Sequence, residues 1–107
     1  MVQTVSNNNL DLINAADVAV VDFNATWCGP CKMLGPVLEE VSKEFTESED
    51  GKIQYFGVDV DANEDLATKF GIMAVPTVFI LKKGERAGYF TGFRPKDDLI
   101  SEIKSKL

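Results

Sequence analysis

The sequence predicts an α/β domain in which a largely parallel sheet is covered by helices on both faces, and three observations support this class. Short apolar runs alternate along the chain with segments of helical spacing. The run at 18–23 is β-branched and almost unbroken, which is typical of a strand buried on both sides. Lys83 and Gly84 form a tight-turn signal between two strand-like runs, which predicts an antiparallel pair at the sheet edge. The expected order is β-α-β-α-β-α-β-β-α, in a single domain over residues 1–107.

The first half of the chain predicts two strands and two helices. A short strand is expected at 2–5, and a short helix from Leu10, with asparagines at 7–9 available to cap it. The buried strand at 18–23 follows. From Cys31 to Phe45, apolar residues recur at helical spacing opposite a charged face, which predicts a long helix. Pro36 lies inside that helix and is expected to kink it.

The second half predicts three strands and two helices. The acidic segment 47–52 is expected to be a solvated loop before an apolar strand at 53–60. A short helix is expected at 63–70, ended by Gly71. The strands 77–81 and 85–91 form the predicted hairpin. Pro95 then opens a closing helix, whose apolar side comprises Leu99, Ile100, Ile103 and Leu107.

Composition narrows the possible partners and the compartment. The chain of 107 residues is 45% hydrophobic, with 17 acidic and 11 basic residues and a net charge of −6 at pH 7. No cluster of lysine and arginine stands out, so neither nucleic acid nor an anionic membrane is an expected partner. No apolar run approaches the roughly 20 residues that span a bilayer. The first residues lack the pattern of a secretory signal, so the protein is expected to be cytoplasmic.

The absence of histidine removes several kinds of catalytic and metal site. With no histidine and only two cysteines, the chain has neither a Ser/His/Asp or Cys/His arrangement nor a four-cysteine zinc site. No glycine-rich phosphate or dinucleotide loop follows any expected strand, so no bound cofactor is predicted. The two cysteines themselves, Cys28 and Cys31, stand in a Cys-x-x-Cys pattern that favours redox chemistry in a reducing compartment. Two incidental thiols in a surface turn are the alternative.

The spacing of the cysteines predicts that they can form a disulfide without moving the backbone. Residues three apart in a helical turn bring their α-carbons into the disulfide range of roughly 4.4–6.8 Å. Cys28 precedes the expected helix, where the positive end of the helix dipole favours a thiolate over a thiol. It is also expected to be the more exposed of the two. The sequence therefore predicts Cys28 as the attacking sulfur and Cys31, one turn inside the helix, as the resolving one.

Asp22 places a carboxylate in the otherwise apolar run at 18–23. Burial without a counter-charge favours the protonated form of such a group. A carboxylate of this kind can take or give the proton that Cys31 must exchange. The alternative is an aspartate at the strand end with its carboxylate in solvent.

The hexapeptide Trp27-Cys28-Gly29-Pro30-Cys31-Lys32 matches the active-site signature of the thioredoxin family, which the chain resembles over essentially its whole length. Further matches fall in register with the family at Asp22, Phe23, Pro36, Val75-Pro76-Thr77 and Gly92. The resemblance implies the thioredoxin fold, with a central mixed five-stranded sheet flanked by four helices. A lone Cys-x-x-Cys is a weak signal, whereas several separated features in register are specific.

The resemblance also implies an activity. Thioredoxins are protein-disulfide reductases and electron carriers that act on disulfide-containing proteins and are recharged by an NADPH-dependent thioredoxin reductase. The Gly29-Pro30 dipeptide is the thioredoxin pair, whereas disulfide isomerases typically carry Gly-His and glutaredoxins Pro-Tyr. A monomer without a bound cofactor is expected. Two alternatives remain: a binding module in which the thiols are incidental, and an oxidant or isomerase of an oxidising compartment.

The resemblance assigns roles residue by residue. It implies that Cys28 is the nucleophile, Cys31 the resolving cysteine and Asp22 the proton relay, and that Pro76 is a cis-proline that positions the substrate backbone. The apolar substrate-binding surface is expected to comprise Trp27, Gly29, Pro30, Ala74, Val75 and Gly92. For Trp27, packing in the core is a nearly equal alternative.

Three positions depart from the family's common pattern. Gly57 stands where many thioredoxins place a lysine beside the buried carboxylate, so the proton relay is expected to be tuned differently. Asn24 stands where an aromatic residue is frequent, and Phe93 where a small residue is frequent. These two departures bear on substrate preference rather than on the chemistry.

Overall fold

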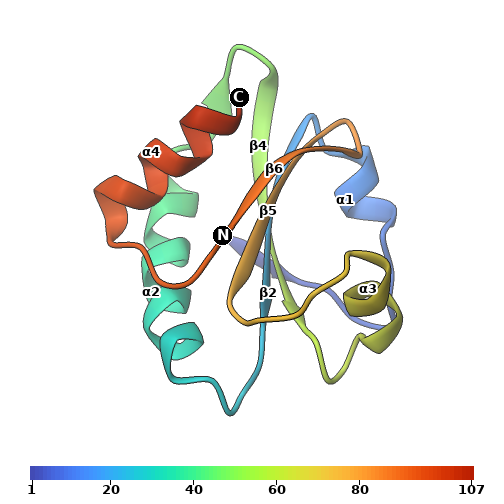
Figure 1. Cartoon of the computed structure of the whole chain (residues 1–107). Helices are drawn as coiled ribbons and strands as arrows, with labels where there is room; N and C mark the ends of the chain where they lie inside the picture. The colour runs from blue at the N-terminus through green and yellow to red at the C-terminus, as the bar shows by residue number, and fades with distance from the viewer.

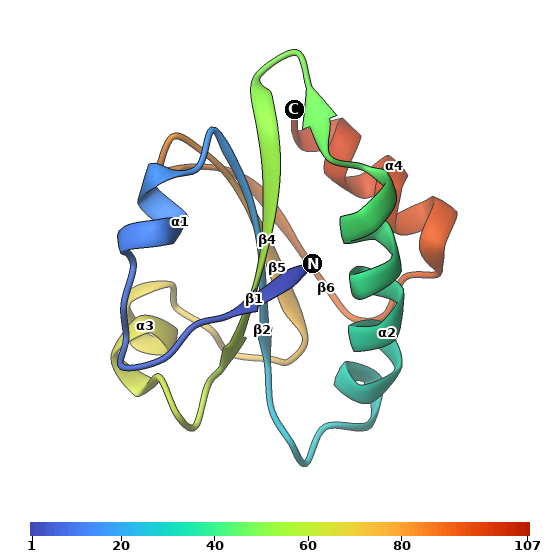
Figure 2. The same ribbon diagram turned by 180° about the vertical axis from the view of Figure 1, so that it is seen from behind.

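A computed structural model describes all residues from 1 to 107. A central sheet separates two pairs of helices: α2 (Gly29–Glu44) and α4 (Lys96–Lys106) cover one face, and α1 (Asp11–Ala15) and α3 (Glu64–Lys69) cover the other (Figures 1 and 2). The four flanking helices and the mixed sheet confirm the predicted thioredoxin fold. None of the helices combines the length and apolar character needed to cross a membrane.

The sheet has the strand order β1-β4-β2-β5-β6. The first three strands in this order run parallel, β5 is antiparallel to β2, and β6 is antiparallel to β5. The bounds in chain order are β1 Val2–Thr4, β2 Val18–Asn24, β4 Gly51–Asp59, β5 Thr77–Lys82 and β6 Glu85–Thr91. Each of these lies within a few residues of its expected position.

The antiparallel pairing of β2 with β5 differs from the largely parallel sheet that the alternation of elements predicted. A parallel crossover must carry the chain back along the whole sheet. The connection from β4 to β5 does not do so, because Val60 at its start and Val75 near its end line the same groove. The chain therefore re-enters the sheet at the end where it left, and β5 runs in the opposite direction.

The segment 47–52 is a hairpin rather than the solvated loop that its acidic composition predicted. A short strand β3, Glu47–Ser48, pairs antiparallel with the first residues of β4. Gly51 adopts a φ of +122°, and a Cβ at this position would lie 2.5 Å from the Asp17 carboxylate. The turn therefore depends on glycine, a local requirement that outweighs the charge of the segment.

Two apolar clusters lie on opposite faces of the sheet. Side chains of β2 alternate between them, so that Ala19, Val21 and Phe23 face α1 and α3. Val18 and Val20 face α2 and α4. Continuing the alternation puts Asp22 on the α2 side, under the first turns of that helix.

Candidate active site at the end of the sheet

Three connections meet at the end of the sheet that is lowest in Figure 1. They are the turn between β2 and α2, the segment 70–76 between α3 and β5, and the connection 92–95 between β6 and α4. Each carries residues that the sequence assigned to the site. The fold therefore gathers segments that are more than 60 positions apart along the chain.

The two cysteines form a disulfide across the first turn of α2. Cys28 is the N-cap residue, Cys31 lies in the first turn, and their α-carbons are 5.3 Å apart. The backbone N–H of Cys31 donates to Sγ of Cys28 at 3.2 Å. The predicted pairing is thus confirmed, and the N-cap position aims the Cys31 N–H at the leading sulfur.

The expectation that Cys28 is the more exposed cysteine is wrong for this disulfide form, because both residues are only 5% exposed. Both sulfurs sit in a small apolar cluster with Ala25, against which Val60 and Val75 pack. The carbonyl oxygen of Val75 lies 3.6 Å from Sγ of Cys28. The bond to Cys31 and the segment before β5 together cover the leading sulfur.

The peptide bond between Val75 and Pro76 is cis. The Val75 carbonyl faces Cys28, while the Val75 N–H donates no hydrogen bond within the molecule. Thr77 Oγ1 donates to the Ala74 carbonyl at 2.6 Å and fixes the turn from the other side. An unpaired N–H next to the disulfide is suited to an incoming extended chain, because strand-like pairing needs such a donor.

A groove of about 430 Å³ lies between Trp27 and the segment 72–75, and we call it the site groove. Its walls include the predicted residues Trp27, Ala74 and Val75. Trp27 is 69% exposed and its Nε1 donates to Asp61 at 2.9 Å, so core packing of this residue is excluded. The predicted residues Gly29 and Pro30 are also exposed, on the first turn of α2, but they do not line the groove.

Sequence reasoning missed four apolar residues of the site groove, Val60, Ala67, Ile72 and Met73. Met73 is 97% exposed, more than any other large apolar residue. The sequence did contain a signal for Ile72 and Met73. These two apolar residues directly follow Gly71, the residue that ends the helical segment. Because they lie beyond the helix, these residues cannot belong to its buried apolar face.

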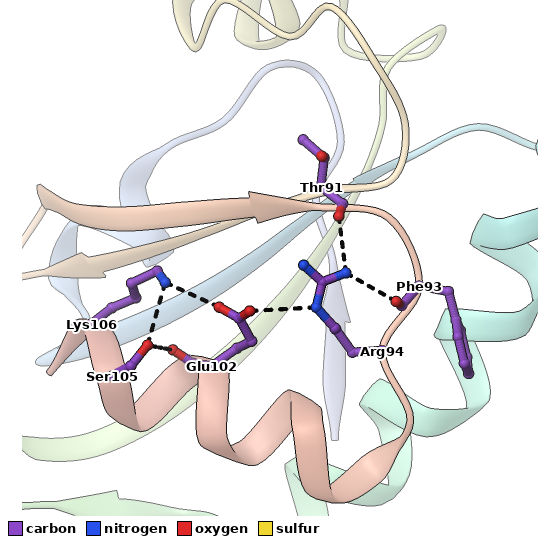
Figure 3. Close-up of polar contacts among 6 residues, drawn as sticks. All are labelled: Thr91, Phe93, Arg94, Glu102, Ser105 and Lys106. Carbon is purple, nitrogen blue, oxygen red and sulfur yellow. Dashed lines mark hydrogen bonds and ion pairs between the residues drawn. The ribbon is translucent and has the colours of Figure 1, made fainter.

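Gly92 lies beside Pro76 rather than in the site groove, because its N–H donates to the Pro76 carbonyl at 2.9 Å. The connection around it is held by Arg94, whose Nη1 donates to the carbonyls of Thr91 and Phe93 at 3.1 and 3.0 Å (Figure 3). Glu102 on α4 accepts from Arg94 at 3.4 Å. Helix α4 thereby fixes the connection next to the cis-proline.

Asp22 is 3% exposed, and its Oδ1 has no hydrogen-bond partner. Burial raises the pKa of Asp22 to about 6, while the nearby Asn24 amide opposes the shift. That amide also donates to the backbone carbonyl of Asp22 at 3.1 Å. Gly57 is the register partner of Asp22 on β4, so the strand next to the carboxyl group offers no cation. A solvent-facing carboxylate, the alternative from the sequence, is excluded.

Comparison with known proteins gives a consistent result. A sequence model of the thioredoxin family matches residues 1–105. Thioredoxin from Staphylococcus saprophyticus is 43% identical over 103 residues, which is 96% of this chain and 95% of the relative. Thioredoxin from Bacillus subtilis is 45% identical over 90 residues, 84% of this chain and 83% of the relative. The structure of a mutant thioredoxin from Halobacterium salinarum has a TM-score of 0.82 at 34% identity, covering 97% of this chain and 88% of that one.

A Cys-x-x-Cys disulfide at the N-terminus of a helix, facing a cis-proline, defines a protein-disulfide oxidoreductase site. The chain belongs to the thioredoxin family. It uses the reversible disulfide between Cys28 and Cys31 as its redox centre.

Proposed function

We propose that this protein reduces disulfide bonds of other proteins, with Cys28 as the attacking sulfur and Cys31 as the resolving one. The observation that carries the assignment is the N-cap position of Cys28, with the Cys31 N–H aimed at its sulfur. In the reduced protein, this donor and the dipole of the sixteen-residue α2 favour the Cys28 thiolate. Cys31 lacks this advantage because it lies inside the first turn.

In the first step, the Cys28 thiolate attacks one sulfur of the substrate disulfide. A mixed disulfide forms, the substrate bond breaks, and the other substrate sulfur leaves as a thiolate that takes a proton from water. The site groove and the free Val75 N–H hold the substrate chain during this step.

In the second step, Cys31 loses its proton and attacks Sγ of Cys28. The intramolecular disulfide forms again, and the second substrate sulfur leaves as a thiolate. The substrate has gained two electrons and the protein has lost two. The step is fast because both cysteines belong to one helical turn, so the effective concentration of the resolving thiol is high.

Asp22 is the proton acceptor for Cys31. It lies beneath the first turns of α2, and a pKa of about 6 leaves it mostly ionised at neutral pH yet able to take up a proton. Its partnerless Oδ1 leaves the acceptor site open. Pro76 positions the substrate by fixing the backbone of Val75.

An NADPH-dependent thioredoxin reductase returns the disulfide to the dithiol, and the reducing cytoplasm is the compartment in which such a donor keeps the pair reduced. The protein works as a monomer without a bound cofactor, and its partners are disulfide-containing proteins and the reductase rather than nucleic acid or membranes. The net charge of −6 accords with this set of partners.

The test is insulin reduction coupled to NADPH oxidation by a thioredoxin reductase. Cys28→Ser should abolish turnover, because the remaining thiol of Cys31 lies inside the first turn and lacks the N-cap position that favours a thiolate at Cys28. Cys31→Ser should accumulate covalent mixed disulfides with the substrate, which mass spectrometry detects. Asp22→Asn should retain the first step but slow the second, and should remove the rate inflection near pH 6.

The control is Lys104→Met, on the outer surface of α4 away from the disulfide, which should turn over like the parent protein. Full activity in either cysteine variant would refute the mechanism. A double cysteine variant that kept its biological activity would favour the binding-module alternative.

A further inference from the structure

A second apolar groove opens on the other side of the segment 71–74, and we call it the β6 groove. It has a volume of about 440 Å³ and lies over β5 and β6, on the sheet face where Phe79 packs in the cluster under α1 and α3. Its floor is formed by Phe79 and Tyr89, register partners whose rings stack with centroids 5.2 Å apart. Tyr89 is 58% exposed, so this stack faces solvent.

The β6 groove is continuous with the site groove. Ile72, Met73 and Ala74 line both, and the almost fully exposed Met73 forms the ridge between them. A chain that pairs with the backbone beside Val75 therefore reaches the β6 groove by crossing Met73. A methionine is an adaptable contact at such a crossing because its side chain is flexible and polarisable.

Arg86 gives the β6 groove its chemical character. Its guanidinium carbon lies 4.5 Å from the centre of the Phe70 ring and 5.2 Å from that of Phe79, and Nη2 donates to the Lys69 carbonyl at 2.9 Å. These contacts hold the side chain in place. Arg86 takes part in none of the ion pairs of the protein, although acidic residues outnumber basic ones by 17 to 11.

A fixed arginine with unused donors beside an apolar floor matches one kind of ligand. Its free N–H groups fit a carboxylate, and the floor fits an aromatic or aliphatic side chain. The charged residues at the site groove are acidic, in contrast to Arg86 at the β6 groove. Asp61 accepts a hydrogen bond from Trp27, and Glu64 lines the wall of the site groove. A bound segment that spans both grooves would therefore meet acidic residues at one end and a basic residue at the other.

We propose that the β6 groove is a second subsite for the disulfide substrate, and that it takes a segment with an apolar side chain next to an aspartate or glutamate. The proposal rests on the proposed disulfide-reductase function and adds to it a preference for sequence at a distance from the reacting sulfur. Arg86 is the residue that determines this preference.

The test uses peptides with one internal disulfide and a flexible extension that ends in Phe-Glu, Phe-Lys or Gly-Gly. The parent protein should reduce the Phe-Glu peptide with a KM about fivefold lower than the Phe-Lys peptide, as expected for one partly exposed charge pair. All three peptides are amidated at the C-terminus, and the Gly-Gly peptide should have a higher KM than the Phe-Glu peptide because it offers neither the ring nor the carboxylate. In Arg86→Met, which keeps the apolar contacts, the ratio of the two KM values should fall to about one. Because the ratio compares peptides within one variant, differences in the amount of active protein cancel.

The matched control is Lys104→Met, since Lys104 is also a cation over an aromatic ring, 5.6 Å from the centre of Phe45. This variant should keep the parent preference. A preference that was absent from the parent protein, or that persisted in Arg86→Met, would overturn the subsite while leaving the reductase function intact. A parent protein that reduced none of the peptides would instead overturn the proposed function. A dimer in sedimentation that Arg86→Met dissociated would assign the β6 groove to a second copy of the chain and also overturn the subsite.

Discussion

Two buried polar residues, Asn63 and Asp22, lie on opposite faces of the sheet. They differ in how far their side-chain atoms are hydrogen-bonded. Asn63 is 0% exposed, and its amide donates to the carbonyls of Val5 and Asp59 at 3.2 and 3.1 Å. Its Oδ1 accepts from the Asn8 N–H at 2.9 Å. Asp22 is almost as deeply buried, yet its Oδ1 has no partner.

The difference separates a polar group that builds the fold from one that we propose serves the chemistry. A buried polar group with all its partners stabilises the chain segments that it joins. Burial of a carboxyl group with one oxygen unpaired disfavours its ionised form, a perturbation that is typical of groups that transfer protons. The four predictions below test this contrast.

The largest effect is expected from Asn63→Ala. The substitution removes the amide that donates to the buried Val5 carbonyl and the oxygen that accepts from the half-buried Asn8 N–H. Because each buried unsatisfied group costs about 1–3 kcal/mol, the free energy of unfolding should fall by about 3–5 kcal/mol. Urea unfolding of the oxidised protein measures it.

The control for this variant is Asn9→Ala, which removes one exposed contact from the Asp11 N–H to the Asn9 side chain. It should cost at most about 1 kcal/mol. Equal losses in the two variants would contradict the structural role of Asn63. The rate of disulfide reduction at a temperature where both are folded should not change.

Asp22→Asn should change stability in a pH-dependent way. The pKa of Asp22 is about 6 in the folded protein, against about 4 for an aspartate in an unfolded chain. Below pH 4 both states are protonated. As the pH rises towards 6, the unfolded state releases its proton first, so stability falls with rising pH and the full cost is present above about pH 7.

Two pKa units correspond to about 3 kcal/mol. Between pH 3 and pH 8, the parent protein should therefore lose about 3 kcal/mol more of its unfolding free energy than Asp22→Asn does. Asp65→Asn, at an exposed position of α3, is the matched control and should follow the parent curve. Parallel curves for the parent and Asp22→Asn would show that the Asp22 carboxyl group is solvated.

The contrast between Asp22 and Asn63 also shows what the sequence reveals. Asp22 was predictable because one carboxylate interrupts an apolar run, and an interruption is visible in a linear pattern. Asn63 looked like an ordinary residue at a helix start, since its partners lie at Val5 and Asn8, more than 50 positions away. Pairings over that distance leave no periodic signal.

The elements themselves were largely predictable, because hydrophobic spacing and turn residues act locally. The direction of β5 was not, since it depends on the connection 60–76 staying at the end of the sheet where β4 ends, which local spacing does not determine. The site groove was predicted in part: Trp27, Ala74 and Val75 follow from the motif, whereas Met73 becomes part of it only when the segment before β5 folds against Trp27. Arg86 gave no sequence signal, because its partners are a carbonyl and two rings on other elements. Arg94 gave none either, because two of its acceptors are main-chain carbonyls, which every residue has.

Gly57→Lys should supply the counter-charge that Asp22 lacks. A Cβ at position 57 would meet Val2 and Asn24 only at 3.5 and 3.8 Å, so a side chain fits without strain. An ammonium group within about 4–6 Å should lower the pKa of Asp22 by about one unit or more. Titration of the Asp22 carboxyl carbon by NMR measures it.

The control for the added charge is Gly57→Met, a side chain of similar length. Met should leave the Asp22 titration near its parent value or raise it through further burial. If lysine and methionine gave the same titration, the side chain at position 57 would have turned away from the carboxyl group. A lowered pKa should also move the inflection of the reduction rate to lower pH.

Two arginines at the surface show the same contrast between a side chain whose donors have partners and one whose donors are partly unused. Arg94 is satisfied by the carbonyls of Thr91 and Phe93 and by Glu102, whereas Arg86 has one acceptor and unused donors. By the reasoning applied to Asn63, Arg94 shapes the site rather than binding its ligand. It holds the connection that carries Gly92, whose N–H pairs with the Pro76 carbonyl.

Arg94→Met should therefore give the smallest of the four effects. Loss of these partly exposed contacts should raise the KM for a protein substrate about two- to threefold and leave kcat unchanged, because the disulfide itself is untouched.

The control is Lys96→Met. It removes comparable ion pairs, to Glu40 and Glu44, that do not involve the connection 92–95. It should therefore change the free energy of unfolding by a similar amount without changing KM. Arg94→Lys should restore KM only in part, because an ammonium group cannot reproduce the fork that reaches two carbonyls and a carboxylate. Equal KM values in Arg94→Met and Lys96→Met would show that the contacts of Arg94 stabilise the fold without positioning the substrate.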